Sequence, residues 1–248
     1  MKTLEAISSR TVCNENGSQV SELMHKLSDS DVANDIRVVH ADGQLLVIDK
    51  PAGLLSVPGR GADKQDCASA RVQRRYPDAM VVHRLDMATS GLMLMGRGAQ
   101  MQRLLSGAFA RREVAKRYVA VVAGQLQAPA HDADGWSLID LPLAADWPRR
   151  PRRIVDAEHG KPSQTRWRVL SFDAERDETR LALEPVTGRT HQLRVHLQAL
   201  GHAILGDRLY GSAQEQARSA RLMLHAGELA LAHPATGEPL AFSSAAPF

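Results

Sequence analysis

The chain has 248 residues, of which 44% are hydrophobic and 24% are charged. This length allows one large domain or two small ones, and the composition is that of a soluble globular protein. The formal net charge is only +3, so the total charge does not by itself indicate a polyanionic partner. The two cysteines, Cys13 and Cys67, have no CxxC spacing, which argues against a disulfide scaffold or a cysteine-based zinc site.

The first part of the chain, residues 1–34, is polar and rich in Ser and Asn. A short amphipathic pattern between Val20 and Leu27 is its one periodic stretch. We expect a loosely attached, partly disordered extension here, followed by a folded domain over residues 35–248. The sequence shows neither a signal-peptide core nor a run of roughly 18 apolar residues. A cytoplasmic protein with no membrane partner is therefore expected, and nothing requires more than a monomer.

The folded part begins with two β-rich segments, residues 36–40 and 45–49, joined by Asp42-Gly43. An Asp-Gly pair between two such segments is a hairpin signal. The sequence Lys50-Pro51-Ala52-Gly53 ends the second strand, and Pro58–Gly61 predicts a further loop.

The middle of the chain contains two periodic stretches. Apolar residues from Met101 to Phe109 follow i, i+3, i+4 spacing, which predicts an amphipathic helix. Val114–Ala123 is apolar on both faces and predicts a buried strand. Trp136–Arg153 contains three prolines and four arginines, and we expect it to be irregular.

The last third of the chain predicts more strands than helices. Residues 165–172 and 179–184 form a strand pair across an acidic turn, and residues 190–200 form a helix that ends at Gly201. Residues 222–242 predict a strand, a second strand and a hairpin return through Pro234–Gly237. Hairpins outnumber βαβ units, so we expect an α+β domain around a mostly antiparallel, mixed sheet with flanking helices.

Arginines are clustered along the chain although the net charge is small. Such clusters can neutralise RNA or DNA phosphates, but a solvated basic surface explains them equally well. The clusters are Arg74-Arg75, Arg111-Arg112, Lys116-Arg117, Arg149-Arg150 and Arg152-Arg153.

Several familiar catalytic patterns are absent. The stretch before Gly160-Lys161 has Val155 where a phosphate-binding P-loop needs glycine. The residues around Ser90 lack the glycines of a hydrolase nucleophile elbow. His191 and His196 are five residues apart, rather than the four that place two imidazoles on one helix face for zinc. No metal site is predicted.

The segment Val82–Leu92 gathers a histidine, an arginine, a carboxylate and two hydroxyls between apolar flanks, and then returns to a strand. Two interpretations stand on these residues alone. One is a surface turn with a capping Asp86, and the other is a functional loop on a rigid scaffold.

This segment resembles the catalytic signature of the RluA family of pseudouridine synthases. Further blocks occur in the same order as in that family, and the likeness extends from about residue 36 to the C-terminus. The blocks are Lys50-Pro51-Ala52-Gly53, His83-Arg84-Leu85-Asp86 with Thr89-Ser90-Gly91, Lys116–Ala120, Thr187–His196, and Leu205-Gly206-Asp207.

The resemblance implies an RNA uridine isomerase with an active-site cleft and no cofactor. It implies that Asp86 is the nucleophile or base and that Arg194 is its charge partner. Tyr118 would stack on the target base and assist its deprotonation, while Arg84 would occupy the space left by the flipped uridine. His83, Thr89 and Ser90 are expected to shape the loop, and His191 and His196 to serve structure or hydrogen bonding.

The loop after Asp146 is expected to contact RNA. Trp147 can stack on a splayed base, and its arginines can bind phosphates, although a solvated arginine loop is the alternative. These arginines are Arg149, Arg150, Arg152 and Arg153.

Residues 53–60 and Asp146-Trp147-Pro148, together with the lack of an S4-like RNA-binding module, resemble the subgroup for which the family is named. The expected partners are therefore a 23S ribosomal RNA loop and a tRNA anticodon stem-loop. A related synthase with a single RNA target is one alternative. A non-catalytic RNA-binding protein and a metal-dependent RNA hydrolase are two others, from different functional classes.

Overall fold

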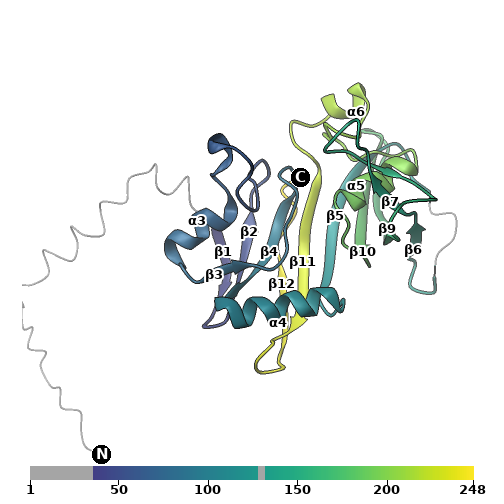
Figure 1. The fold of residues 1–248 in the computed structure, drawn as a ribbon. Helices are drawn as coiled ribbons and strands as arrows, with labels where there is room; N and C mark the ends of the chain where they lie inside the picture. Colours follow the sequence, from purple (N-terminus) through teal and green to yellow (C-terminus); the bar gives the residue numbers. More distant parts are fainter. Residues whose placement is uncertain (1–35, 128–131) are drawn as a thin grey trace, which may run out of the picture. The chain divides into compact units, whose positions relative to one another are not determined.

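The computed structural model describes residues 36–127 and 132–248, so the extension expected at residues 1–34 lies outside the described residues. Most of the strands join one ten-stranded sheet (Figure 1). Every strand pair in it is antiparallel except β4 with β11, which pair in parallel over two residues. The expected α+β class with a mostly antiparallel, mixed sheet is confirmed.

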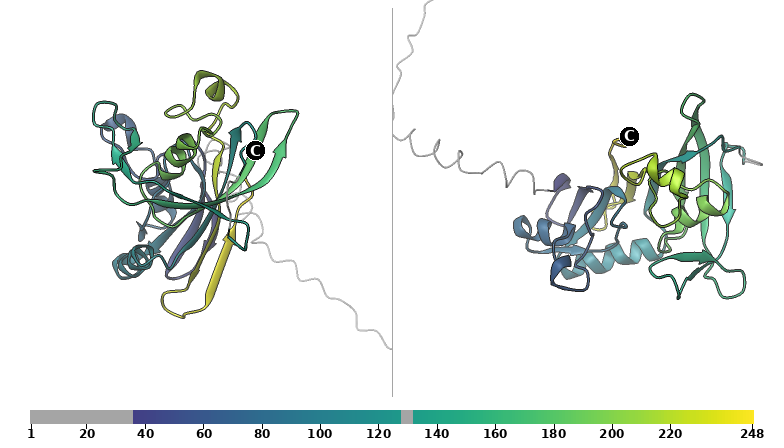
Figure 2. Two further views of the ribbon diagram at one scale, coloured as in Figure 1. Left: turned by 90° about the vertical axis from the view of Figure 1, so that its right-hand side faces the viewer. Right: turned by 90° about the horizontal axis from the view of Figure 1, so that it is seen from above.

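The strands follow a spatial order that differs from their order in the chain. Across the sheet this order is β1 (Arg37–Ala41), β2 (Leu45–Lys50), β4 (Ser90–Arg97), β11 (Leu224–Ala232), β5 (Ala115–Ala123), β10 (Glu178–Pro185), β9 (Gln164–Asp173) and β6 (Ser137–Asp140). In addition, β3 (Ala79–Val81) pairs with β4, and β12 (Pro239–Ser243) pairs with β11. Figure 2 shows the twist of the sheet, whose purple and green ends run in different directions.

Alternation along β2 divides its side chains between two hydrophobic clusters, because successive residues of a strand point to opposite faces. Leu46 and Ile48 belong to the cluster that includes residues of α3 (Ala68–Arg75). Leu45 and Val47 belong to the cluster under α4 (Gly98–Ala110). The predicted first hairpin and the predicted amphipathic helix are confirmed by these elements.

A third cluster lies beneath α5 (Gln192–Ala199), between strands β5, β9 and β10. It contains Trp167, which is almost completely buried, and Leu193 and Leu197 from the helix. The helix ends as expected, with Gly201 at a φ of 83°, the left-handed conformation that commonly follows a helix C-terminus. The predicted strand pair of residues 165–172 and 179–184 is also confirmed.

The close contact of β4 with β11 depends on Gly91. Its φ is 114°, and a Cβ at this position would lie 2.3 Å from the carbonyl oxygen of Ala226. Only glycine allows the two backbones to approach so closely. This contact places the loop before β4, residues 82–89, next to β11 and β5 in the middle of the sheet.

Two sequence expectations need correction, and one helix was missed. Trp136–Arg153 is not irregular: it contains β6, β7 (Leu143–Ala145) and the start of β8 (Arg153–Val155), and β7 and β8 form a separate two-stranded sheet. Strand β5 is buried only at residues 120–122, because its first half lines a cavity. Helix α3 was not predicted, since its polar sequence has few apolar positions. The described part of the chain contains no helix long and apolar enough to span a membrane.

Candidate active site

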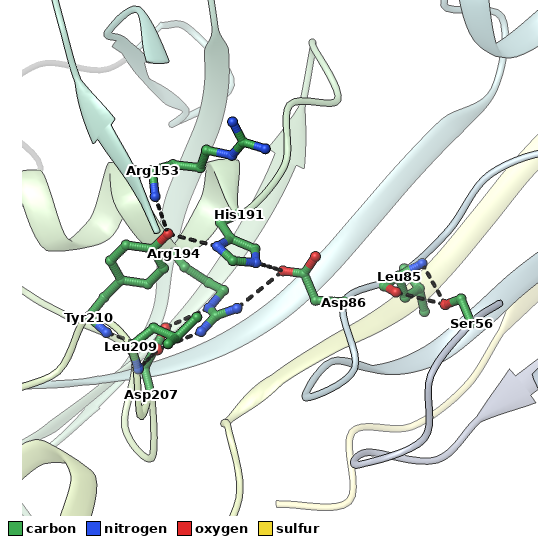
Figure 3. Close-up of polar contacts among 9 residues, drawn as sticks. All are labelled: Ser56, Leu85, Asp86, Arg153, His191, Arg194, Asp207, Leu209 and Tyr210. Atoms are coloured by element: carbon green, nitrogen blue, oxygen red, sulfur yellow. Dashed lines mark hydrogen bonds and ion pairs between the residues drawn. The ribbon is translucent and has the colours of Figure 1, made fainter. Parts of the chain in front are cut away.

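Asp86 lies on the loop between β3 and β4, and its carboxylate faces α5 (Figure 3). The guanidinium of Arg194, on α5, donates a hydrogen bond from Nη1 to Asp86 Oδ2 at 3.3 Å. The Arg194 side chain is only 5% exposed, whereas that of Asp86 is 23% exposed. The arginine is therefore a buried support, and the carboxylate remains accessible from the cavity.

A second carboxylate, that of Asp207, orients the arginine. Arg194 Nε and Nη2 donate to the two oxygens of Asp207 at 2.7 Å each, a bidentate geometry that fixes the guanidinium plane. Asp207 is completely buried and also accepts the backbone N–H groups of Leu209 and Tyr210. Burial alone would lower the pKa of Arg194, but its bonds to Asp207 and the nearby charges raise it, so the guanidinium stays charged.

The Lys50-Pro51-Ala52-Gly53 block binds the backbone of the Asp86 loop. Lys50 Nζ donates to the carbonyls of Pro51 and Leu54 at 2.8 Å and of Met87 at 3.2 Å. The N–H of Gly53 donates to the same Met87 carbonyl at 2.8 Å. The carbonyl directly after Asp86 is therefore held by two donors from this block.

Ser56 holds the other side of the same loop. Its hydroxyl donates to the carbonyl of Leu85 at 2.7 Å and accepts the N–H of Leu85 at 3.1 Å (Figure 3). Within the loop, the N–H of Thr89 donates to the carbonyl of Asp86. The backbone on both sides of Asp86 is therefore fixed by hydrogen bonds from another segment, a form of preorganisation that catalytic groups need.

Lys50 is also a second cation close to Asp86. Its burial lowers its pKa to about 8, although the negative charge of Asp86 opposes this shift. In the unfolded chain a lysine titrates near 10.5. The folded protein therefore binds fewer protons than the unfolded chain between these values, so the free energy of unfolding rises with pH in this window.

We expect wild-type protein to gain about 1–2 kcal/mol of stability between pH 8 and pH 9.5 from this residue. Urea unfolding at both pH values measures the gain. Lys50→Met removes the titrating group and should flatten this dependence, whereas Lys64→Met, at an exposed lysine, should retain it. A Lys50→Met protein with the wild-type dependence would contradict the shifted pKa.

A chain of polar contacts connects the backbone of Arg153 with Asp86. The N–H of Arg153 donates to Tyr210 Oη at 2.8 Å, and this hydroxyl lies 2.7 Å from His191 Nδ1. His191 Nε2 in turn lies 3.8 Å from Asp86 Oδ2 (Figure 3). If the tyrosine donates its own proton to Nδ1, the proton of a neutral imidazole is on Nε2 and faces the carboxylate. Burial lowers the pKa of His191, which favours this neutral form.

Asp86, Arg84, Tyr118 and Arg194 all line one cavity of about 830 Å³. The structure thus brings together the four residues expected around the reacting base. Arg84 is exposed, and within residues 36–127 and 132–248 its side chain has no hydrogen bond or ion pair. Burial, and to a lesser extent the charge of Asp86, raises the pKa of Tyr118 well above its usual value. The phenol is therefore protonated at neutral pH, which suits stacking and disfavours a phenolate base.

The arginine loop does not line this cavity. Trp147 is 69% exposed, and the guanidinium of Arg150 lies 3.5 Å from the centre of its ring. Arg149 forms an ion pair with Asp146 at 2.8 Å. The Nε atoms of Arg152 and Arg153 are buried and lack a hydrogen-bond partner in the described structure. The Arg153–Tyr210–His191 chain links the loop to Asp86.

The remaining histidine and serine expectations can be compared with the contacts. His196 is buried between the hydroxyl of Thr165 and the carbonyl of Leu141, at 2.9 and 3.0 Å, as expected for a structural residue. His83 accepts the N–H of Leu94, and Ser90 lies 2.8 Å from His225 Nδ1. Both hold the ends of the Asp86 loop. His191, in contrast, lies 3.8 Å from the Asp86 carboxylate, closer than expected for a residue with a purely structural role.

Sequence reasoning gave no role to Lys50, Ser56, Asp207 or Tyr210. The signal was present for Lys50 and Asp207, because both belong to blocks that carry the family resemblance. Spacing in the chain, however, does not show which distant groups these side chains contact. Among the residues that the structure describes, no group of three or more His, Cys, Asp or Glu side chains is arranged to hold a metal ion.

Two solved structures of human proteins named for an RNA pseudouridylate synthase domain share this fold. The structure matches human RNA Pseudouridylate Synthase Domain Containing 1 with a TM-score of 0.70 and 28% identity, covering 87% of this chain and 85% of that one. It matches human RNA Pseudouridylate Synthase Domain Containing 4 with a TM-score of 0.66 and 26% identity, covering 85% and 88%. The fold and the site thus define a pseudouridine synthase.

A family model described as RNA pseudouridylate synthase matches residues 44–199. The chain is 46% identical over 211 residues to the protein named Dual-specificity RNA pseudouridine synthase RluA of Escherichia coli (strain K12), covering 85% of this chain and 93% of that protein. The RluA of Yersinia pestis is also 46% identical, covering 85% and 99%. The chain therefore belongs to the RNA pseudouridine synthase family and is an isomerase.

Proposed function

We propose that the protein converts uridine to pseudouridine in two classes of RNA, a 23S ribosomal RNA loop and a tRNA anticodon stem-loop. The similarity to proteins named as dual-specificity enzymes supports the two classes of substrate. The single observation that carries the chemistry is the Asp86 carboxylate, which is accessible from the cavity and hydrogen-bonded to buried Arg194 at 3.3 Å.

The reaction breaks the N1–C1′ bond of uridine and forms a C5–C1′ bond. The uracil turns so that C5 faces C1′. C5 loses its proton to water and N1 takes one proton from water, so the product is an isomer of the substrate and no electrons are gained or lost. The chemistry thus requires a nucleophile or base next to the sugar and the uracil. Asp86 fills this role, with Arg194 keeping the carboxylate charged in a partly desolvated site.

Tyr118 and Arg84 complete the proposed site. The Tyr118 ring provides a flat surface for the flipped uracil, and the raised pKa of its hydroxyl supports stacking rather than base catalysis. Removing a base from its stack costs a few kcal/mol. The exposed guanidinium of Arg84, which has no ion pair among the described residues, can occupy the gap in the RNA and offset part of that cost.

Tritium release from RNA labelled at C5 of uridine tests this function, since C5 loses its hydrogen during the isomerisation. Wild-type protein should release tritium from both a 23S ribosomal RNA fragment and tRNA, with no effect of EDTA. Release from one RNA alone would identify a single-target synthase. Tight binding without release would indicate an RNA-binding protein, and EDTA-sensitive strand cleavage a metal-dependent hydrolase.

We also propose that the arginine loop binds RNA phosphates. The test measures the slope of the logarithm of the RNA binding constant against the logarithm of the salt concentration. This slope should become shallower by about 0.7–0.9 for each phosphate that the loop no longer neutralises when its arginines are changed to Gln. The changed residues are Arg149, Arg150, Arg152 and Arg153. A control with the same change in charge replaces exposed Arg37, Arg103, Arg111 and Arg176 and should keep the wild-type slope. Equal slopes for the two variants would remove the loop from the interface.

A further inference from the structure

Among the cations that line the cavity, two pairs of side chains contrast in their partners. On one wall, Arg117 pairs with Glu184 at 2.8 Å and with Glu228 at 3.0 Å. Arg166 pairs with the same Glu184 at 3.0 Å and with Asp132 at 2.8 Å. Carboxylates of the protein already balance these arginines, so they have little charge left for a ligand.

The second pair is Arg112, after the end of α4, and Lys116, at the start of β5, and neither has a carboxylate partner among the described residues. In the part of the chain that the structure describes, Lys116 and Arg112 form no ion pair and no side-chain hydrogen bond. Burial lowers the pKa of Lys116, and no neighbouring acid acts against the shift. A partly desolvated ammonium without a counterion is unfavourable, and a bound anion would remove this cost.

The backbone at the end of α4 places Arg112 at the cavity. Arg112 has a φ of 63°, a left-handed conformation that usually takes glycine after a helix. Its N–H donates to the carbonyl of Phe109, and the next N–H, that of Glu113, donates to Ala108. An arginine here is an unusual choice, since glycine would have less strain. Adjacent Arg111 does not line the cavity and pairs with Glu113 at 2.7 Å.

An uncharged surface lies beside the two cations. The rings of His83 and Phe109 stack at 4.4 Å, and Lys116 Nζ lies 5.5 Å from the centre of the Phe109 ring. His83 Nε2 accepts the N–H of Leu94, and burial lowers the pKa of His83 to about 3, so the imidazole is neutral. This part of the cavity therefore offers flat, uncharged rings next to positive charge, which suits a sugar-phosphate segment.

We propose that Lys116 and Arg112 form a phosphate subsite for the RNA strand that flanks the flipped uridine. Lys116 precedes Tyr118 by two residues on β5, a distance of roughly 7 Å along the strand. Both side chains line the same cavity, so a strand whose uracil contacts Tyr118 passes close to Lys116. The proposal rests on the proposed function, because it takes Tyr118 as the surface that receives the base.

The test measures binding of a tRNA anticodon stem-loop over a series of salt concentrations, with all proteins in the Asp86→Asn background so that the RNA is not converted. Lys116→Gln and Arg112→Gln should each reduce the log–log salt slope by about 0.7, the value for one phosphate on a single strand. Arg111→Gln, which removes an equal charge outside the cavity, should keep the slope. Lys116→Arg should retain it as well, since the charge is preserved.

A slope for Lys116→Gln equal to that for Arg111→Gln would overturn the subsite. The melting temperature separates binding from folding: an unpaired lysine that serves a ligand can be replaced by glutamine without loss of thermal stability. A large fall in melting temperature for both Lys116→Gln and Lys116→Arg would instead identify a structural residue and also overturn the proposal.

Two further results separate the alternatives. If inorganic phosphate raises the melting temperature of wild type but not of Lys116→Gln, and the RNA salt slopes are equal, the site binds a small phosphate and the RNA assignment is wrong. Failure of the proposed function appears separately, as a wild-type protein that releases no tritium. A changed slope in Lys116→Gln would then still show that the cavity binds RNA phosphate.

Discussion

Asp86→Asn is expected to reduce tritium release by at least about 10²–10⁴-fold, the usual contribution of a positioned catalytic group. The amide has the shape of the carboxylate but is neither a nucleophile nor a base of comparable strength. RNA affinity should stay within a few fold, because the change removes a negative charge from a surface that binds a polyanion. Single-turnover tritium release and equilibrium binding measure the two effects.

The same variant should remain folded. Arg194 keeps its two bonds to Asp207 when Asp86 becomes neutral, and the loop backbone is held by Ser56 and Lys50 rather than by the carboxylate. The melting temperature should therefore be close to that of wild type. Asp63→Asn, at an exposed aspartate outside the cavity, is the matched control and should retain full activity. Turnover near the wild-type rate in Asp86→Asn would disprove the catalytic assignment.

Local patterns were sufficient for several of the regular elements of the fold, although not for helix α3. The Asp42-Gly43 hairpin, the amphipathic helix and the strand pair before α5 all follow from residues close together in the chain. The pattern failed between Trp136 and Arg153, where the proline-rich stretch contains short strands. Strands of three or four residues have too few alternating positions to be recognised in a sequence.

The contacts of the site required more than local pattern. The resemblance led to the prediction that Arg194 is the partner of Asp86, although 108 positions separate the two residues. No spacing rule connects Lys50 with the carbonyl of Met87, or Asp207 with the guanidinium of Arg194. These contacts depend on how β2, β4 and α5 pack, so only the three-dimensional structure shows them.

The structure also shows how the surroundings of one carboxylate are held in place. Asp86 is influenced by three groups: Arg194 on α5, His191 directly before α5, and Lys50 at the end of β2. Asp207 holds Arg194, and Tyr210 holds His191, by hydrogen bonds that do not involve Asp86. The arrangement is thus complete before RNA binds, which lowers the reorganisation needed during the reaction.

Arg194→Met is expected to lower activity to the level of Asp86→Asn and to destabilise the protein by about 3–5 kcal/mol. Methionine fills a similar volume but leaves Asp207, whose side chain is fully buried, without its cation. It also removes the hydrogen bond to Asp86. Urea unfolding and tritium release measure the two losses, and Arg194→Lys should show smaller losses because it keeps the charge without the bidentate geometry.

A second substitution separates the structural role of Arg194 from its role at the carboxylate. In Arg194→Met with Asp207→Asn, the buried negative charge is removed, so much of the lost stability should return. Activity should not return, because Asp86 still lacks its hydrogen-bonded cation. Recovery of both properties in the double variant would show that Arg194 serves only to neutralise Asp207. Recovery of stability alone would establish that the guanidinium positions and charges the catalytic carboxylate.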